Sequence, residues 1–97
     1  MNFDPYIFME IAVHHDSGGA DIDLLREGVD YRQKVVLTDF ELRSGLEHLS
    51  QSHLIRKRGS KYFVSAPNVP SLPRTTAGRL SFRRRDWDEL RKTLFES

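Results

Sequence analysis

The segment from Thr38 to Ser65 constrains the fold most, because it encodes a capped amphipathic helix that runs directly into a tight hairpin. Thr38 and Glu41 have the spacing of a capping box, in which each side chain accepts a hydrogen bond from the other residue's free backbone N–H. Gly45 costs about 1 kcal/mol relative to alanine inside a helix, so we expect it to allow the close approach of a neighbouring helix. Leucines at i, i+4 and i+7 predict one buried stripe: Leu42, Leu46 and Leu49.

A hairpin should follow this helix, because two β-prone runs are separated by a glycine-containing pair. Alternation along the strands turns Ile55 inward and places Tyr62 and Val64 on one shared face. The predicted first strand, turn and second strand are Leu54–Arg58, Gly59–Ser60 and Lys61–Ser65.

Two further helices are predicted before this segment. The first should run from Asp4 to about His15, with Pro5 in its first turn and Asp4 as its N-cap. The second should be shorter and run from Asp21 to about Arg26 or Glu27, with an apolar side formed by isoleucine and leucine.

The connection between the second and third helices is ambiguous in the sequence. Gly28 could end or interrupt the second helix, and residues 29–34 could continue it or form a loop. Val35–Leu37 is short, apolar and β-branched, and it predicts a small strand that pairs with the hairpin.

After the hairpin, three prolines and several small polar residues predict an irregular connector over residues 66–83. A C-terminal helix should then run from about Arg84 to Phe95 within the final segment 84–97. Its apolar stripe has the i, i+3, i+7 spacing: Trp87, Leu90 and Leu94.

The composition indicates one globular domain over residues 1–97, with residues 1–65 forming the core and the hairpin. The absence of cysteine excludes disulfides, zinc–thiolate sites and a thiol nucleophile, and it favours the reducing cytoplasm. No apolar run approaches the roughly 20 residues that a membrane-spanning helix needs, and no basic secretory signal begins the chain. We therefore expect no membrane association.

The net charge of +1 conceals a strong asymmetry. Residues 1–50 carry four Arg and Lys against ten acids, whereas residues 51–97 carry eleven Arg and Lys against four acids. A basic half can indicate an anionic partner. Equally, the two halves can neutralise each other within the fold or across a dimer.

The run from Leu37 to Arg56, followed by Tyr62-Phe63-Val64-Ser65, resembles the winged helix-turn-helix superfamily in its threonine cap, its leucine pattern, its Leu-Ile pair and its basic hairpin. With the first helix, the resemblance covers roughly two-thirds of the chain. Residues 24–31 are similar to small uncharacterised bacterial winged-helix proteins. The chain departs from the family at His53, where glycine is usual.

The resemblance implies an α+β fold with a three-helix core, a two- or three-stranded antiparallel wing and an extra C-terminal helix. In that family the third helix commonly enters the major groove of DNA. Asp39, Glu41 and Glu47 would then meet a polyanion, which is a physical argument against ordinary groove insertion; the alternative is a merely solvated helix face. The candidate contacts on this helix are Arg43, Ser44, His48 and Gln51.

The hairpin suits nucleic acid better, since four cations surround one turn: Arg56, Lys57, Arg58 and Lys61. These cations fit phosphates or a minor groove, or they protect a sheet edge from association. A second basic cluster, Arg83–Arg85, stands beside Trp87 and could contact single strands or phosphates. An ordinary helix start with a buried Trp87 is the favoured interpretation of that cluster.

Nothing in the sequence favours an enzyme. The adjacent residues His14 and His15 point apart on a helix, and no cysteine or compact carboxylate set completes a metal site. The serines lack a nucleophile motif, and no glycine-rich phosphate loop follows a strand. We expect no catalytic residue, no metal and no cofactor.

The leading hypothesis is a cytoplasmic, dimeric transcriptional regulator that contacts duplex DNA mainly through the hairpin. The C-terminal helix would supply the dimer or partner contact through Trp87, Leu90 and Leu94. The alternative is a winged-helix protein–protein interaction module that does not bind DNA and uses the acidic helix face or exposed apolar surface. A structural domain of a larger assembly is the third hypothesis.

Overall fold

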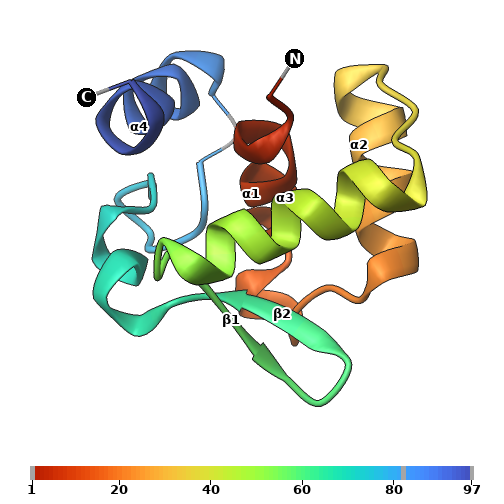
Figure 1. The fold of residues 1–97 in the computed structure, drawn as a ribbon. Coiled ribbons are helices and arrows are strands. Elements are labelled where there is room, and N and C mark those ends of the chain that lie inside the picture. The colour runs from red at the N-terminus through yellow and green to blue at the C-terminus, as the bar shows by residue number, and fades with distance from the viewer. Residues whose placement is uncertain (1, 82, 97) are drawn as a thin grey trace. The chain divides into compact units, whose positions relative to one another are not determined.

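The computed structural model describes residues 2–81 and 83–96. The chain is an α+β protein that divides into two compact units, residues 1–65 and residues 66–97. The N-terminal unit contains, in order, α1 (Asp4–Val13), the 3-10 turn η1 (His15–Ser17), α2 (Ile22–Gln33), α3 (Asp39–Gln51), β1 (Ile55–Arg58) and β2 (Lys61–Val64) (Figure 1). The C-terminal unit contains the 3-10 helix η2 (Ala66–Ser71) and α4 (Arg84–Phe95).

Helix α1 is the central element of the N-terminal unit, because it contacts α2, α3 and β2. Its buried side is apolar apart from one acid: Ile7, Phe8, Glu10, Ile11 and Ala12. The predicted N-cap was wrong by one position, since Asp4 is the first helical residue and its N–H donates to Asn2 Oδ1 at 3.0 Å. The helix also ends at Val13 rather than His15, because η1 and the positive φ angles of Gly18 and Gly19 turn the chain.

Helix α2 continues through Gly28 to Gln33, which settles the ambiguity in the sequence. The prediction of a shorter second helix was wrong, since α2 has 12 residues and α1 has 10. The Asp21 side chain caps it by accepting from the Leu24 N–H at 2.8 Å. Gly28 is buried against Glu10, and a β-carbon at this position would lie 2.7 Å from Glu10 Cδ. The glycine therefore serves helix packing and does not break the helix.

The predicted strand at Val35–Leu37 was wrong, since these residues form an irregular link between α2 and α3. Because α2 extends to Gln33, few residues remain before the α3 cap. The additional pairing with the hairpin comes from Ala20, whose N–H donates to the Tyr62 carbonyl at 3.1 Å and whose carbonyl accepts from the Tyr62 N–H at 2.8 Å.

Among the helices, α3 agrees best with its prediction from the sequence. Thr38 Oγ1 accepts from the Glu41 N–H at 3.1 Å, and Glu41 Oε1 accepts from the Thr38 N–H at 2.9 Å, so the capping box is complete. The three stripe leucines are buried. A β-carbon at Gly45 would overlap Ile7 Cδ1, which confirms the close approach of a neighbouring helix, α1.

The hairpin also confirms its prediction, although each strand is one residue shorter than expected. Strands β1 and β2 pair antiparallel with Ile55 opposite Val64 and Arg58 opposite Lys61, and Gly59 has a φ of +61° in the turn. Ile55, Tyr62 and Val64 are buried, as alternation predicts. The remainder of β1 is exposed.

In the C-terminal unit, the segment predicted as irregular contains η2 and a turn that is closed by pairing of Arg74 with Leu80. Helix α4 has the predicted limits, Arg84–Phe95, and the predicted burial of Trp87 is confirmed. The Trp87 indole N–H donates to the Ser81 carbonyl at 2.7 Å. None of the helices within residues 2–81 and 83–96 has the length and apolar character required to cross a bilayer.

Candidate nucleic-acid interface

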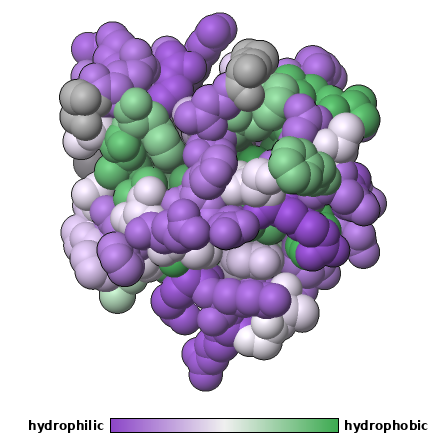
Figure 2. Space-filling model, in the orientation of Figure 1, coloured by the Kyte–Doolittle hydropathy of each residue, from purple (hydrophilic) through white to green (hydrophobic). Residues whose placement is uncertain are grey.

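The hairpin concentrates four predicted cations around one turn. Arg56, Lys57 and Arg58 occupy consecutive exposed positions on β1, and Lys61 faces Arg58 across the ladder. Within the described residues, the Arg58 side chain makes no hydrogen bond or ion pair. The hairpin end of the surface in Figure 2 is mostly hydrophilic. This arrangement can contact an anion along one strand and at the turn.

Two of these cations lie over aromatic rings of β2. The Arg56 guanidinium is 4.8 Å from the centroid of the Phe63 ring, and Lys57 Nζ is 5.6 Å from the centroid of the Tyr62 ring. Both pairs are direct cross-strand neighbours, so the ladder itself sets these contacts. Cation–π contacts restrict the long side chains while leaving their charges available to an anion.

The aromatic partners are themselves held in place. The Phe63 ring meets the His15 ring edge-on with centroids 5.8 Å apart, and Gly19 lacks the β-carbon that would collide with Phe63. His15 Nδ1 accepts from the Val64 N–H at 3.1 Å. The face that carries Arg56 is therefore supported by η1 and by the glycine that follows it.

Lys61 differs from the other hairpin cations because it has an acidic neighbour. Its Nζ lies 3.6 Å from Asp21 Oδ2 at the start of α2. The pKa of Asp21 is held below its ordinary value, chiefly by the hydrogen bond from the Leu24 N–H and also by Lys61. Asp21 therefore stays ionised and reduces the positive potential at Lys61.

The four predicted contacts on α3 lie on its outer side, but they do not form a cationic surface. Arg43 is exposed and Ser44 is half-buried. His48 Nδ1 lies 3.4 Å from Asp4 Oδ2, and Gln51 Nε2 donates to Glu47 Oε1 at 3.2 Å. Two of the four candidates are thus engaged with acids.

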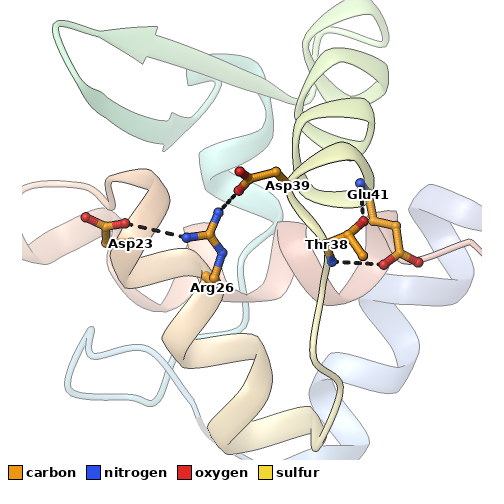
Figure 3. Close-up of polar contacts among 5 residues, drawn as sticks. All are labelled: Asp23, Arg26, Thr38, Asp39 and Glu41. Atoms are coloured by element: carbon orange, nitrogen blue, oxygen red, sulfur yellow. Dashed lines mark hydrogen bonds and ion pairs between the residues drawn. The ribbon is translucent and has the colours of Figure 1, made fainter.

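The acids at the start of α3 have structural roles (Figure 3). Arg26 of α2 lies between Asp23 and Asp39, 3.7 Å from Asp23, and donates to Asp39. Glu41 completes the capping box with Thr38. These acids stabilise the α2–α3 junction, so the negative charge on α3 follows from how the helix is anchored.

A groove of about 390 Å³ lies beside α3. Residues 2–4 form one wall, and the side of α3 from Phe40 to His48 forms the other. The Phe40 side chain is 79% exposed. Burial raises the pKa of Asp4 at this groove, although His48 opposes the shift. The leucine stripe of α3 places Phe40 on the opposite, exposed side of the helix. The groove itself depends on the packing of α1, and no local sequence pattern indicates it.

The predicted dimer contacts in α4 are largely covered within the single chain. Trp87 and Leu90 are buried and Leu94 is half-buried. The basic cluster before Trp87 is involved in ion pairs, with Arg83 Nε and Arg84 Nε each 4.0 Å from an aspartate of the same helix. A dimer contact through these apolar residues stays a prediction.

Within the described residues, no group of three His, Asp or Glu side chains could hold a metal ion. No family model, curated protein or solved structure matches the chain.

Proposed function

We propose that this protein binds duplex DNA through its hairpin and acts as a non-enzymatic transcriptional regulator of the winged-helix type. The observation that carries the proposal is the exposed edge of β1, where Arg56, Lys57 and Arg58 follow one another and Lys61 stands opposite. Phosphate binding requires such a concentration of positive charge and supplies most of the affinity of non-specific complexes.

Three features support the winged-helix arrangement. The order of three helices and a hairpin agrees with it, and Ala20, between α1 and α2, pairs with β2 as a short third strand would. His53 has a φ of +59°, so it takes the left-handed backbone conformation at the position where the family usually has glycine.

The aromatic contacts favour binding because they restrict Arg56 and Lys57 before any ligand arrives. Ordering a long side chain at an interface costs roughly 0.5–1.5 kcal/mol. Side chains that already lie along the strand lose less freedom when they meet a phosphate. The hairpin therefore makes the DNA contact, and α3, with its anchored acids, need not reach a base.

Fluorescence anisotropy with a labelled random duplex tests the proposal. Four phosphate contacts predict that the logarithm of the binding constant falls with the logarithm of salt concentration with a slope of about −3.6. The triple variant Arg56→Ala/Lys57→Ala/Arg58→Ala should bind much more weakly, with a slope nearer about −0.9.

The double variant Arg84→Ala/Arg85→Ala is the matched control, since it removes exposed cations from α4 and leaves the hairpin intact. Its binding should remain close to that of the wild type. Absence of binding by the wild-type protein at salt below about 50 mM, or equal loss in both variants, would refute the hairpin contact.

A further inference from the structure

The second candidate contact surface of the N-terminal unit is apolar. Phe40, in the first turn of α3, is 79% exposed, and Val36 in the preceding link is also highly exposed. Figure 2 shows apolar surface over the α2–α3 connection and the start of α3. An aromatic ring held in water by a well-capped helix has no role in the packing of its own unit.

The groove beside α3 is shaped by small residues. Ser44 and Gly45 line it, and Gly45 lets α1 approach so closely that a β-carbon would lie 3.1 Å from Asp4 Oδ1. Phe3 lines the opposite wall. The groove therefore has an aromatic wall, formed by Phe3, and a base of small residues, Ser44 and Gly45. The exposed Phe40 ring lies beside it.

Polar and charged side chains line both sides of the exposed face of α3, in an order that would let two copies of the helix pair with each other. At 100° per residue, Phe40 and Ser44 lie near the centre of the exposed face. One flank carries Arg43 and Glu47, and the other carries an acid and a base at the groove, Glu41 and His48. The first flank thus contains both signs along the helix axis, and the second carries a carboxylate and an imidazole.

We propose that α3 is the contact helix of a homodimer, in which two α3 helices pack antiparallel about a two-fold axis near Ser44. Such an axis places each flank against the same flank of the second copy. Arg43 then meets Glu47 of the second copy, and Glu41 meets His48 of the second copy. The Phe40 ring reaches the Ser44–His48 segment of the second copy, beside its groove.

A second copy fits this surface better than a strongly basic partner. A basic partner would satisfy Glu41 and Glu47 but would oppose Arg43, for which the described residues provide no ion-pair partner. The antiparallel arrangement satisfies both signs on the same flank and aligns the two helix dipoles favourably. The pairing uses no residue of the basic hairpin, so the inference does not depend on DNA binding.

The size of the contact predicts its strength. Helix α3 has 13 residues and a length of roughly 20 Å. A helix pair of this length buries less than the roughly 800 Å² per partner of a standard stable interface. We expect a dissociation constant on the order of 10 µM, which places the equilibrium within reach of analytical ultracentrifugation.

Sedimentation equilibrium of the full chain tests the role of Phe40. Phe40→Ser should weaken dimerisation at least about tenfold, because it removes the central aromatic contact. Tyr31→Ser is the matched control, since Tyr31 is 75% exposed on α2, outside the proposed contact. Circular dichroism should show both variants folded, because neither side chain is buried.

A charge exchange tests the antiparallel pairing itself. Arg43→Glu and Glu47→Arg should each be monomeric, because each places like charges together across the two-fold axis. An equimolar mixture of the two variants should form a heterodimer, since opposite charges then meet at both positions. A monomeric wild type at millimolar concentration, a dimer insensitive to Phe40→Ser, or a mixture that stays monomeric would each overturn the proposal.

Discussion

Replacing Gly28 by alanine should destabilise the N-terminal unit, although alanine is the better helix former. The intrinsic preference favours alanine by about 1 kcal/mol. However, the new β-carbon would overlap Glu10 Oε1 and lie 2.7 Å from Glu10 Cδ. The carboxylate would have to leave its 2.9 Å hydrogen bond from Arg32 Nη1, at a cost of roughly 1.5–3 kcal/mol, and overpacking adds roughly 1–3 kcal/mol. We expect a net loss of about 1.5–5 kcal/mol.

The effect of Gly28→Ala on stability should change from destabilising to stabilising when the Glu10 side chain is shortened. In the Glu10→Ala background the carboxylate no longer occupies the space beside Gly28, so only the helix preference remains. Gly28→Ala should then stabilise the protein by about 1 kcal/mol. Residues in direct contact are the ones for which such a double-mutant cycle gives a large coupling energy.

Urea unfolding followed by far-UV circular dichroism is the appropriate assay, because the single tryptophan, Trp87, lies in the C-terminal unit and reports on α4. Ser50→Ala, at an exposed position of α3, is the control for helix preference and should change stability by less than about 0.7 kcal/mol. If Gly28→Ala stabilised the wild-type background, or had the same effect in both backgrounds, the assigned contact with Glu10 would be refuted.

Two further predictions concern the buried acid Glu10 and His53, whose backbone is in the left-handed conformation. Burial raises the pKa of Glu10 above its ordinary 4.5 despite Arg32, so the folded state retains this proton to higher pH and stability falls as pH rises through that window. Glu10→Gln should remove this decline of stability with pH. If the free energies of unfolding of variant and wild type ran parallel as functions of pH above 4.5, the prediction would be contradicted. His53→Gly should raise the free energy of unfolding by about 0.5–1 kcal/mol, because glycine adopts a φ near +59° without steric cost; an unchanged or lower urea midpoint would contradict this.

The elements that the sequence predicts well are those specified by near neighbours. The capping box of α3 needs only Thr38 and Glu41, and the hairpin turn needs only Gly59 between two β-prone runs. Each signal spans a few residues, so tertiary packing does not alter it. The exposure of Phe40 follows from the same local helical phase.

The features that the sequence does not predict depend on distant residues. Gly28 resembles a helix end until Glu10, from another helix, is placed against it. Ala20 has no strand signal, and its pairing with Tyr62 exists because η1 and two glycines return the chain to the hairpin. Val35–Leu37 has β propensity but pairs with no strand, so context overrides propensity.

The two proposals together account for a third helix that is acidic beside a hairpin that is basic. Asp39 and Glu41 anchor α3, through Arg26 and through the cap, and cations at these positions would weaken the helix. A hairpin that contacts phosphates supplies affinity without base information. A single copy would therefore hold DNA with little sequence preference.

If α3 joins two copies, the second hairpin binds at a high effective concentration and at a spacing fixed by the two-fold axis. Selectivity would then come from the spacing and deformability of the DNA, which requires no side chain of α3 to reach a base.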